Sequence, residues 1–152
     1  MRRALPTVLA LVALAAVPWP AFASDASVRR ALSAYESRLT ADIGRLASFS
    51  TPSRAGAAAT IAALGKVRSD LDGAVRAADG QRASTSAGRR GRALVLSGLR
   101  EALTAAGDAK SAAVAARSGH TAAAKAATAR EQKAIDRAIP LFESGGKLLH
   151  LF

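Results

Sequence analysis

Four arginines lie close together near the middle of the chain, at Arg82, Arg89, Arg90 and Arg92. The surrounding residues 81–91 are rich in serine and glycine, which predicts a loop. Arginine presents a planar fork of donors that suits phosphate and carboxylate oxygens, and a glycine-rich loop can wrap around an anion. The cluster therefore predicts an anion-binding site. A solvated, mobile loop without a ligand is the alternative.

The C-terminus holds a second candidate site. Residues 147–152 form an apolar tail that begins with one lysine, and its large side chains are Leu148, Leu149, Leu151 and Phe152. Such a tail can fold back over the end of the domain, where burial stabilises by about 25 cal/mol per Å². It can also stay exposed for a protein partner or a membrane surface. The sequence thus leaves two predictions open, a tail buried against the end of the bundle and a partner-binding tail.

Groups for metal binding or nucleophilic catalysis are few. The only histidines are His120 and His150, neither has a partner at ligand spacing, and the chain has no cysteine. An acid–base pair would have to be assembled in three dimensions from carboxylates such as Glu36, Glu101 and Glu131, which no sequence spacing indicates. We therefore expect no enzyme activity, no metal and no cofactor.

Most of the remaining carboxylates have a basic residue three or four positions away. Asp42 follows Arg38 by four residues, and Asp72 precedes Arg76 by four. This spacing places two side chains next to each other on a helix surface. The pattern predicts ordinary exposed ion pairs at both places.

The elements that would position these residues are predicted to be helices. After residue 23 the sequence is rich in alanine, the best helix former, and its larger apolar residues recur at spacings of three or four. Helices are predicted at residues 25–49, 52–79, 92–118 and 121–144.

Proline and glycine mark the predicted helix ends. Thr51 and Pro52 suit the start of the second helix, Gly80 its end, and Gly119 the end of the third. Pro140 should kink or weaken the fourth helix, and the Gly145–Gly146 pair should break it.

Four helices of about 25 residues with short links predict an all-α fold, an antiparallel up-down four-helix bundle that is rich in alanine. Many inward positions are alanine, which allows close helix approach but buries little area per residue. An open helical array that completes its core by dimerising, or by docking on a partner, is the alternative.

The N-terminus predicts a signal peptide at residues 1–23. It combines Arg2 and Arg3, an apolar run over residues 4–17 that is too short for a stable transmembrane helix, and small residues at Ala21 and Ala23. Cleavage after Ala23 would leave one domain, residues 24–152. We expect the general secretory route and a periplasmic, cell-wall-associated or secreted protein that is not integral to the membrane after cleavage.

The positive charge is concentrated in the second half of the chain. Without the leader the chain keeps 20 of its 22 lysines and arginines against 11 acidic residues, and residues 81–152 hold 12 of these basic residues against 5 acidic ones. Such a field attracts anionic partners. Aromatic side chains for stacking on bases are few, so we expect no nucleic-acid role.

These observations predict an exported, non-catalytic binding module of the bacterial envelope. Its expected partner is an anionic envelope polymer or a membrane surface, contacted through the basic second half. The alternative is a protein-binding or self-assembling structural protein, a homo-oligomer included, that uses the apolar tail or an alanine face.

Overall fold

The computed structural model describes residues 26–48 and 54–148 of the chain. Within these ranges the chain forms four helices and no strand, which confirms the all-helical prediction. The helices are α2 (Ala26–Ser48), α3 (Arg54–Asp79), α4 (Ser86–Arg117) and α5 (Thr121–Leu148). The predicted signal peptide lies outside the described residues.

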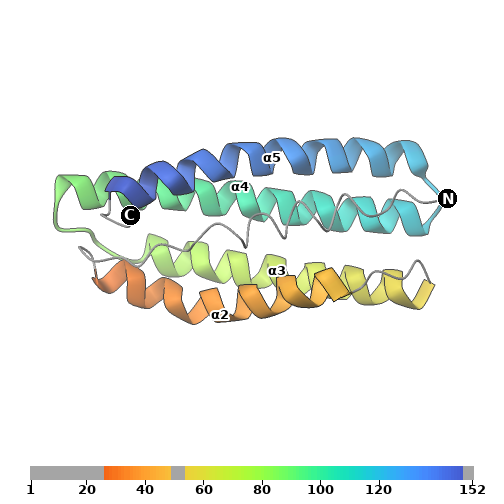
Figure 1. Cartoon of the computed structure of the whole chain (residues 1–152), viewed down its shortest axis with the longest axis horizontal. Coiled ribbons are helices and arrows are strands. Elements are labelled where there is room, and N and C mark those ends of the chain that lie inside the picture. Colours follow the sequence, from red (N-terminus) through yellow and green to blue (C-terminus); the bar gives the residue numbers. More distant parts are fainter. Residues whose placement is uncertain (1–25, 49–53, 149–152) are drawn as a thin grey trace.

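The four helices extend along the long axis of the molecule (Figure 1). Their contacts follow the chain order: α2 lies against α3, α3 against α4, and α4 against α5, and no other pair of described helices approaches as closely. Two bonds show that α4 and α5 are antiparallel. Glu101 of α4 bonds to Arg137 of α5, and Asp108, farther along α4, bonds to Arg130, which is earlier in α5.

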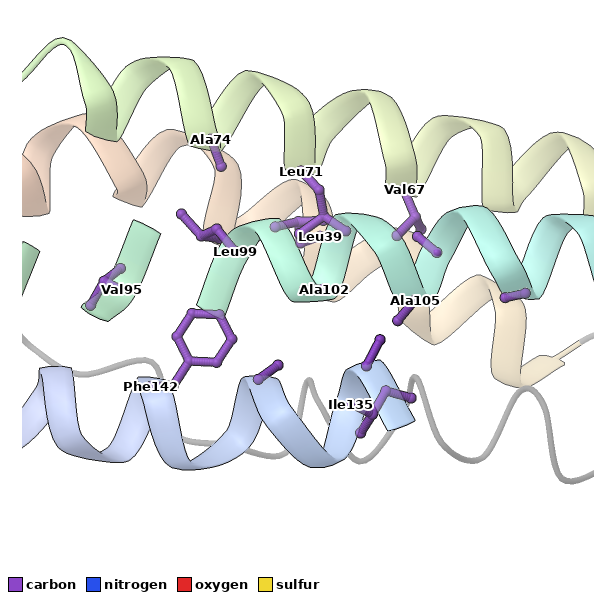
Figure 2. Close-up of a cluster of buried hydrophobic side chains, with 14 of the residues drawn as sticks. Leu39, Val67, Leu71, Ala74, Val95, Leu99, Ala102, Ala105, Ile135 and Phe142 are labelled. Atoms are coloured by element: carbon purple, nitrogen blue, oxygen red, sulfur yellow. The ribbon is translucent and has the colours of Figure 1, made fainter. Parts of the chain in front are cut away.

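The core combines a few large apolar side chains with many alanines (Figure 2). Leu39, Leu71, Leu99 and Ile135 are at most 2 % exposed. Between α4 and α5 the buried side chains are mainly alanine, and they include Ala102, Ala105, Ala109, Ala134 and Ala138. Small side chains let two helices approach closely, so dispersion contacts between backbones replace bulky packing. Val114 is the only large hydrophobic residue exposed in the described part of the chain.

Two glycines permit the closest approach of α4 and α5. A Cβ on Gly98 would come within 3.1 Å of the Phe142 ring, and one on Gly145 would lie 3.1 Å from the Gly91 carbonyl oxygen. The predicted break at Gly145–Gly146 is therefore wrong, because α5 continues to Leu148 and uses Gly145 to contact α4. The helix also continues through the exposed Pro140.

The start of α4 also differs from the prediction. The helix begins at Ser86 rather than at residue 92, so the predicted 81–91 loop is confined to residues 81–85. Thr85 has extended backbone and its hydroxyl accepts a 2.9 Å hydrogen bond from the Gly88 amide. This is N-capping, which supplies one of the acceptors that the first turn of a helix lacks. The serine and threonine residues that suggested a loop therefore begin the helix.

The turn between α4 and α5 forms as the sequence indicates. Gly119 has a positive φ of 78°, a conformation that glycine adopts without steric cost. The His120 amide donates to the Ala115 carbonyl at 2.9 Å, which closes the end of α4. No helix in residues 26–48 or 54–148 has both the length and the apolarity needed to span a bilayer.

Candidate functional site

Arg92, the last member of the arginine cluster, holds α3 and α4 together. Its Nε donates a 3.0 Å hydrogen bond to the Ala78 carbonyl, and its Nη2 donates to the Asp79 carbonyl. Nη2 also lies 3.5 Å from Asp79 Oδ1. The last carbonyls of a helix have no partner within the helix, so Arg92 satisfies two such groups at the end of α3. Arg92 therefore has a structural role at this junction.

The other three arginines of the cluster are exposed around the same junction. Arg89 donates from Nη1 to the Ser84 carbonyl at 3.0 Å. Arg82 and Arg90 form no hydrogen bond or ion pair with any described residue. The two guanidinium groups free to meet an anion at the predicted site are thus Arg82 and Arg90.

Two of the five acids of the second half are held in interhelical ion pairs. Arg137 bonds to Glu101 at 2.9 Å, and Arg130 bonds to Asp108 at 2.9 Å, both from α5 to α4. Among the described residues several exposed cations form no ion pair, and in this half they are Arg82, Arg89, Arg90, Arg117, Lys125, Lys133 and Lys147. The charge excess seen in the sequence is therefore present as unneutralised side chains on the surface.

Of the apolar tail, only its first two residues fall within the described chain. Lys147 and Leu148 belong to α5, so the helix includes the start of the predicted tail. Leu148 is half-buried. Leu149, Leu151 and Phe152 lie outside the described residues.

A buried ionic network between α2 and α3 was not anticipated. Asp42 is only 2 % exposed, and Lys66 Nζ donates to its two carboxylate oxygens at 2.9 and 2.7 Å. Arg45 Nη1 lies 3.6 Å from Asp42 Oδ1. The prediction of an exposed Arg38–Asp42 pair is wrong, because Asp42 lies one turn beyond Leu39 on the buried side of α2. The predicted Asp72–Arg76 pair is present on the surface of α3.

Asp70 extends this network. Burial raises the pKa of Asp70, a hydrogen bond with Asp42 raises it further, and the positive charge of Lys66 opposes both. Its Oδ2 is buried and has no partner among the described residues. The negative charge of Asp42 also raises the pKa of Asp70, because two carboxylates side by side repel each other. The bonds between Lys66 and Asp42 connect α3 to α2.

Glu131 is the second unanticipated buried acid. It is 1 % exposed, and neither carboxylate oxygen has a partner in the described chain. Burial raises its pKa to about 8, and the negative charge of Asp108 adds to the shift. Glu131 precedes the buried Ile135 by four residues, which is the sequence signal that places it on the buried side of α5.

The three glutamates considered for acid–base chemistry are not shown to converge. Glu101 is bonded to Arg137, Glu131 is enclosed, and the side chain of Glu36 lies outside the described residues. No group of three or more metal-ligating side chains occurs in the described part of the chain. His120 is exposed at the α4–α5 turn.

A shallow surface cavity lies beside the middle of α4. Its volume is about 400 Å³, and we call it the α4 cleft. The lining residues are Arg68 of α3 and Leu103, Thr104, Gly107, Asp108 and Ser111 of α4.

Comparisons with protein-family models, characterised proteins and solved structures found no match. The charges and contacts described above are therefore the basis for a functional proposal.

Proposed function

We propose that this protein is an exported, non-catalytic helical module of the bacterial envelope that holds an anionic polymer or lipid surface through its basic second half. The carrying observation is that the acids Glu101 and Asp108 are held by arginines of α5, while several exposed cations have no pair. Unpaired cations on a surface produce a positive field that attracts a polyanion, and salt screens that attraction.

The fold supports this role by keeping the cations on a stiff scaffold. We propose that the four helices form an antiparallel up-down bundle after removal of residues 1–23. Cations at fixed positions on long helices can contact successive charges of a polymer. Because the helices already hold these cations in place, binding has a lower entropic cost. Arg82 and Arg90 mark one end of that surface, at the α3–α4 junction.

The test is cosedimentation of the purified protein with bacterial envelopes at low and high salt. The informative variant is Arg82→Gln/Arg90→Gln, which removes two unpaired cations and leaves Arg92 bonded to the end of α3. The matched control is Lys125→Gln/Lys133→Gln, which removes the same charge from α5.

We expect binding at low salt that is lost at high salt, and weaker binding in the arginine variant than in the lysine control. Equal loss in both variants would assign binding to the overall field rather than to the junction, which contradicts the predicted site. Binding that neither salt nor either substitution changes would contradict the anionic-surface proposal altogether.

The alternative, a protein-binding or self-assembling structural protein, draws on a different observation. Helices α2 and α5 do not contact each other as consecutive helices do, so the described core is assembled in series. A second copy or a partner helix would complete such a core. This alternative predicts association that survives high salt and depends on concentration, which sedimentation velocity measures directly.

A further inference from the structure

The α4 cleft is bordered by cations that no acid neutralises. Arg68 lines it, is exposed, and forms no hydrogen bond or ion pair with a described residue. Lys110 follows the lining residue Gly107 by one turn and is half-buried without an ion pair. Its ammonium lies 3.6 Å from the position that a Cβ on Gly65 would occupy, so the side chain extends from α4 to α3 one turn before Arg68.

One acid also lines the cleft, but its charge is already compensated. The Asp108 side chain is 16 % exposed and accepts a 2.9 Å hydrogen bond from Arg130 Nε. Arg68 and Lys110 therefore remain as excess positive charge beside the cavity. The local balance favours an anion.

The hydroxyl groups of Thr104 and Ser111 also line the cleft. Thr104 and Ser111 donate hydrogen bonds at 3.0 Å to the carbonyls of Arg100 and Gly107 in their own helix. Each hydroxyl can rotate toward a ligand oxygen, because those interior carbonyls also accept the ordinary helical hydrogen bonds.

Gly107 keeps the cleft open. No atom lies within 4 Å of the place where its Cβ would be, whereas a Cβ on Gly98 or Gly145 would lie 3.0–3.1 Å from its nearest neighbours. A glycine inside a helix costs about 1 kcal/mol relative to alanine. Here the missing side chain leaves open space beside Arg68 and the two hydroxyls.

We propose that the α4 cleft binds a phosphate group, with Arg68 and Lys110 supplying charge and Thr104 and Ser111 supplying hydroxyl donors. The guanidinium fork matches a phosphate edge in a bidentate arrangement. The inference rests on the proposed function in taking the partner to be anionic, but it names a site separate from the Arg82–Arg92 cluster.

The experiment is a titration of the purified protein with inorganic phosphate at constant ionic strength, followed by amide shifts in ¹H–¹⁵N NMR spectra. We expect saturable shifts at Thr104, Gly107 and Ser111. Arg68→Gln should weaken the phosphate affinity about tenfold, the effect of losing one hydrogen bond between charged groups.

A second variant separates ligand loss from damage to the fold. Gly107→Leu fills the cleft and replaces glycine by a good helix former, so we expect weaker phosphate binding together with a higher Tm. Gly44→Leu is the matched control, because Gly44 is an exposed glycine of α2 that also has no atom within 4 Å of its missing Cβ. It should raise Tm and leave phosphate binding unchanged.

Vesicles containing anionic phospholipid identify the source of the phosphate. Shifts at the same amides with vesicles would assign a lipid head group, and phosphate binding without a vesicle effect would assign a soluble or polymer-borne phosphate. Both results support the cleft. Shifts that do not saturate, or that persist in Arg68→Gln and Gly107→Leu, would overturn it.

Envelope cosedimentation of the same variants separates the two proposals. Salt-sensitive envelope binding with no saturable phosphate effect would overturn the cleft and leave the proposed function standing. Saturable phosphate binding without any envelope binding would support the cleft and contradict the proposed function.

Discussion

At the scale of single residues, the unpaired carboxyl group of Glu131 is the strongest source of pH dependence. A buried carboxylate without a hydrogen-bond donor is costly, so in the folded protein the side chain stays protonated up to about pH 8. Its pKa is about 8 in the folded chain and near 4.5 in a solvated one. Between these values the folded state binds more protons than the unfolded state. The free energy of unfolding therefore falls as the pH rises from about 4.5 to about 8.

Glu131→Gln removes this titration while keeping the shape of the side chain. At pH 5 or below we expect the variant and the parent protein to unfold at similar urea concentrations. At pH 8.5 the variant should be more stable by about 3 kcal/mol, as the shift in pKa implies after relaxation of the helices around the charge. Glu143→Gln, at an exposed position of the same helix, should change little. Parallel pH profiles for the Glu131 variant and the parent protein would show that the carboxyl is not enclosed.

At the scale of elements, the junction of α3 and α4 depends on two side chains, one at the start of α4 and one in its second turn. Thr85 caps the start of α4, and Arg92 reaches back to the carbonyls of Ala78 and Asp79. These bonds connect the end of one helix to the first turns of the next. The relative placement of the two helices is thereby fixed.

Arg92→Gln should lower the free energy of unfolding by about 1–2 kcal/mol, since charge-assisted hydrogen bonds to the end of α3 are lost. Arg90→Gln changes the same charge at an exposed position without such bonds, so we expect an effect within about 0.5 kcal/mol. Urea unfolding of the two variants measures the difference. Equal stability would contradict the role assigned to Arg92.

Glycine to alanine substitutions should act in opposite directions in two helices. Gly145→Ala introduces a Cβ 3.0 Å from Val95 and 3.1 Å from the Gly91 carbonyl, so we expect a loss of about 1–3 kcal/mol as α5 is pushed from α4. Gly44→Ala meets no neighbour and should gain about 0.5–1 kcal/mol. Thermal unfolding tests both. A neutral Gly145→Ala would show that the close approach of α4 and α5 is absent.

The same elements show how far the sequence predicts the fold. Apolar spacing and alanine content predict four helices, because both signals are local. The start of α4 was misplaced because serine and threonine occur both in loops and at helix caps, and Thr85 acts as a cap. The end of α5 was misplaced because Gly145 provides a contact with α4, and glycine pairs also end helices. Contacts within the folded chain therefore decide where α4 begins and where α5 ends.

The candidate site was predictable to a similar degree. The arginine cluster is visible in the sequence, but the bond from Arg92 to the end of α3 depends on how two helices meet. The α4 cleft likewise requires Arg68 of α3 to lie beside α4. Asp42 and Glu131 both occur at the spacing of buried residues, so their burial is in the sequence pattern. Because Asp42 and Glu131 are acidic, a search for apolar residues at that spacing does not include them.

At the scale of the whole molecule, the account depends on charge that the fold leaves unpaired. Ion pairs between α4 and α5 occupy Glu101 and Asp108, and the network between α2 and α3 encloses Asp42. Several acids are thus used within the structure, while many cations face solvent. A chain organised in this way should associate with polyanions by releasing their counterions.

The most direct test of this claim is the affinity of the purified protein for isolated bacterial envelopes, measured at a series of salt concentrations. The account predicts that the logarithm of the association constant falls linearly with the logarithm of the salt concentration, and that the slope becomes shallower in Arg82→Gln/Arg90→Gln. An association constant that does not change across the salt series would contradict the account and point to an apolar protein interface.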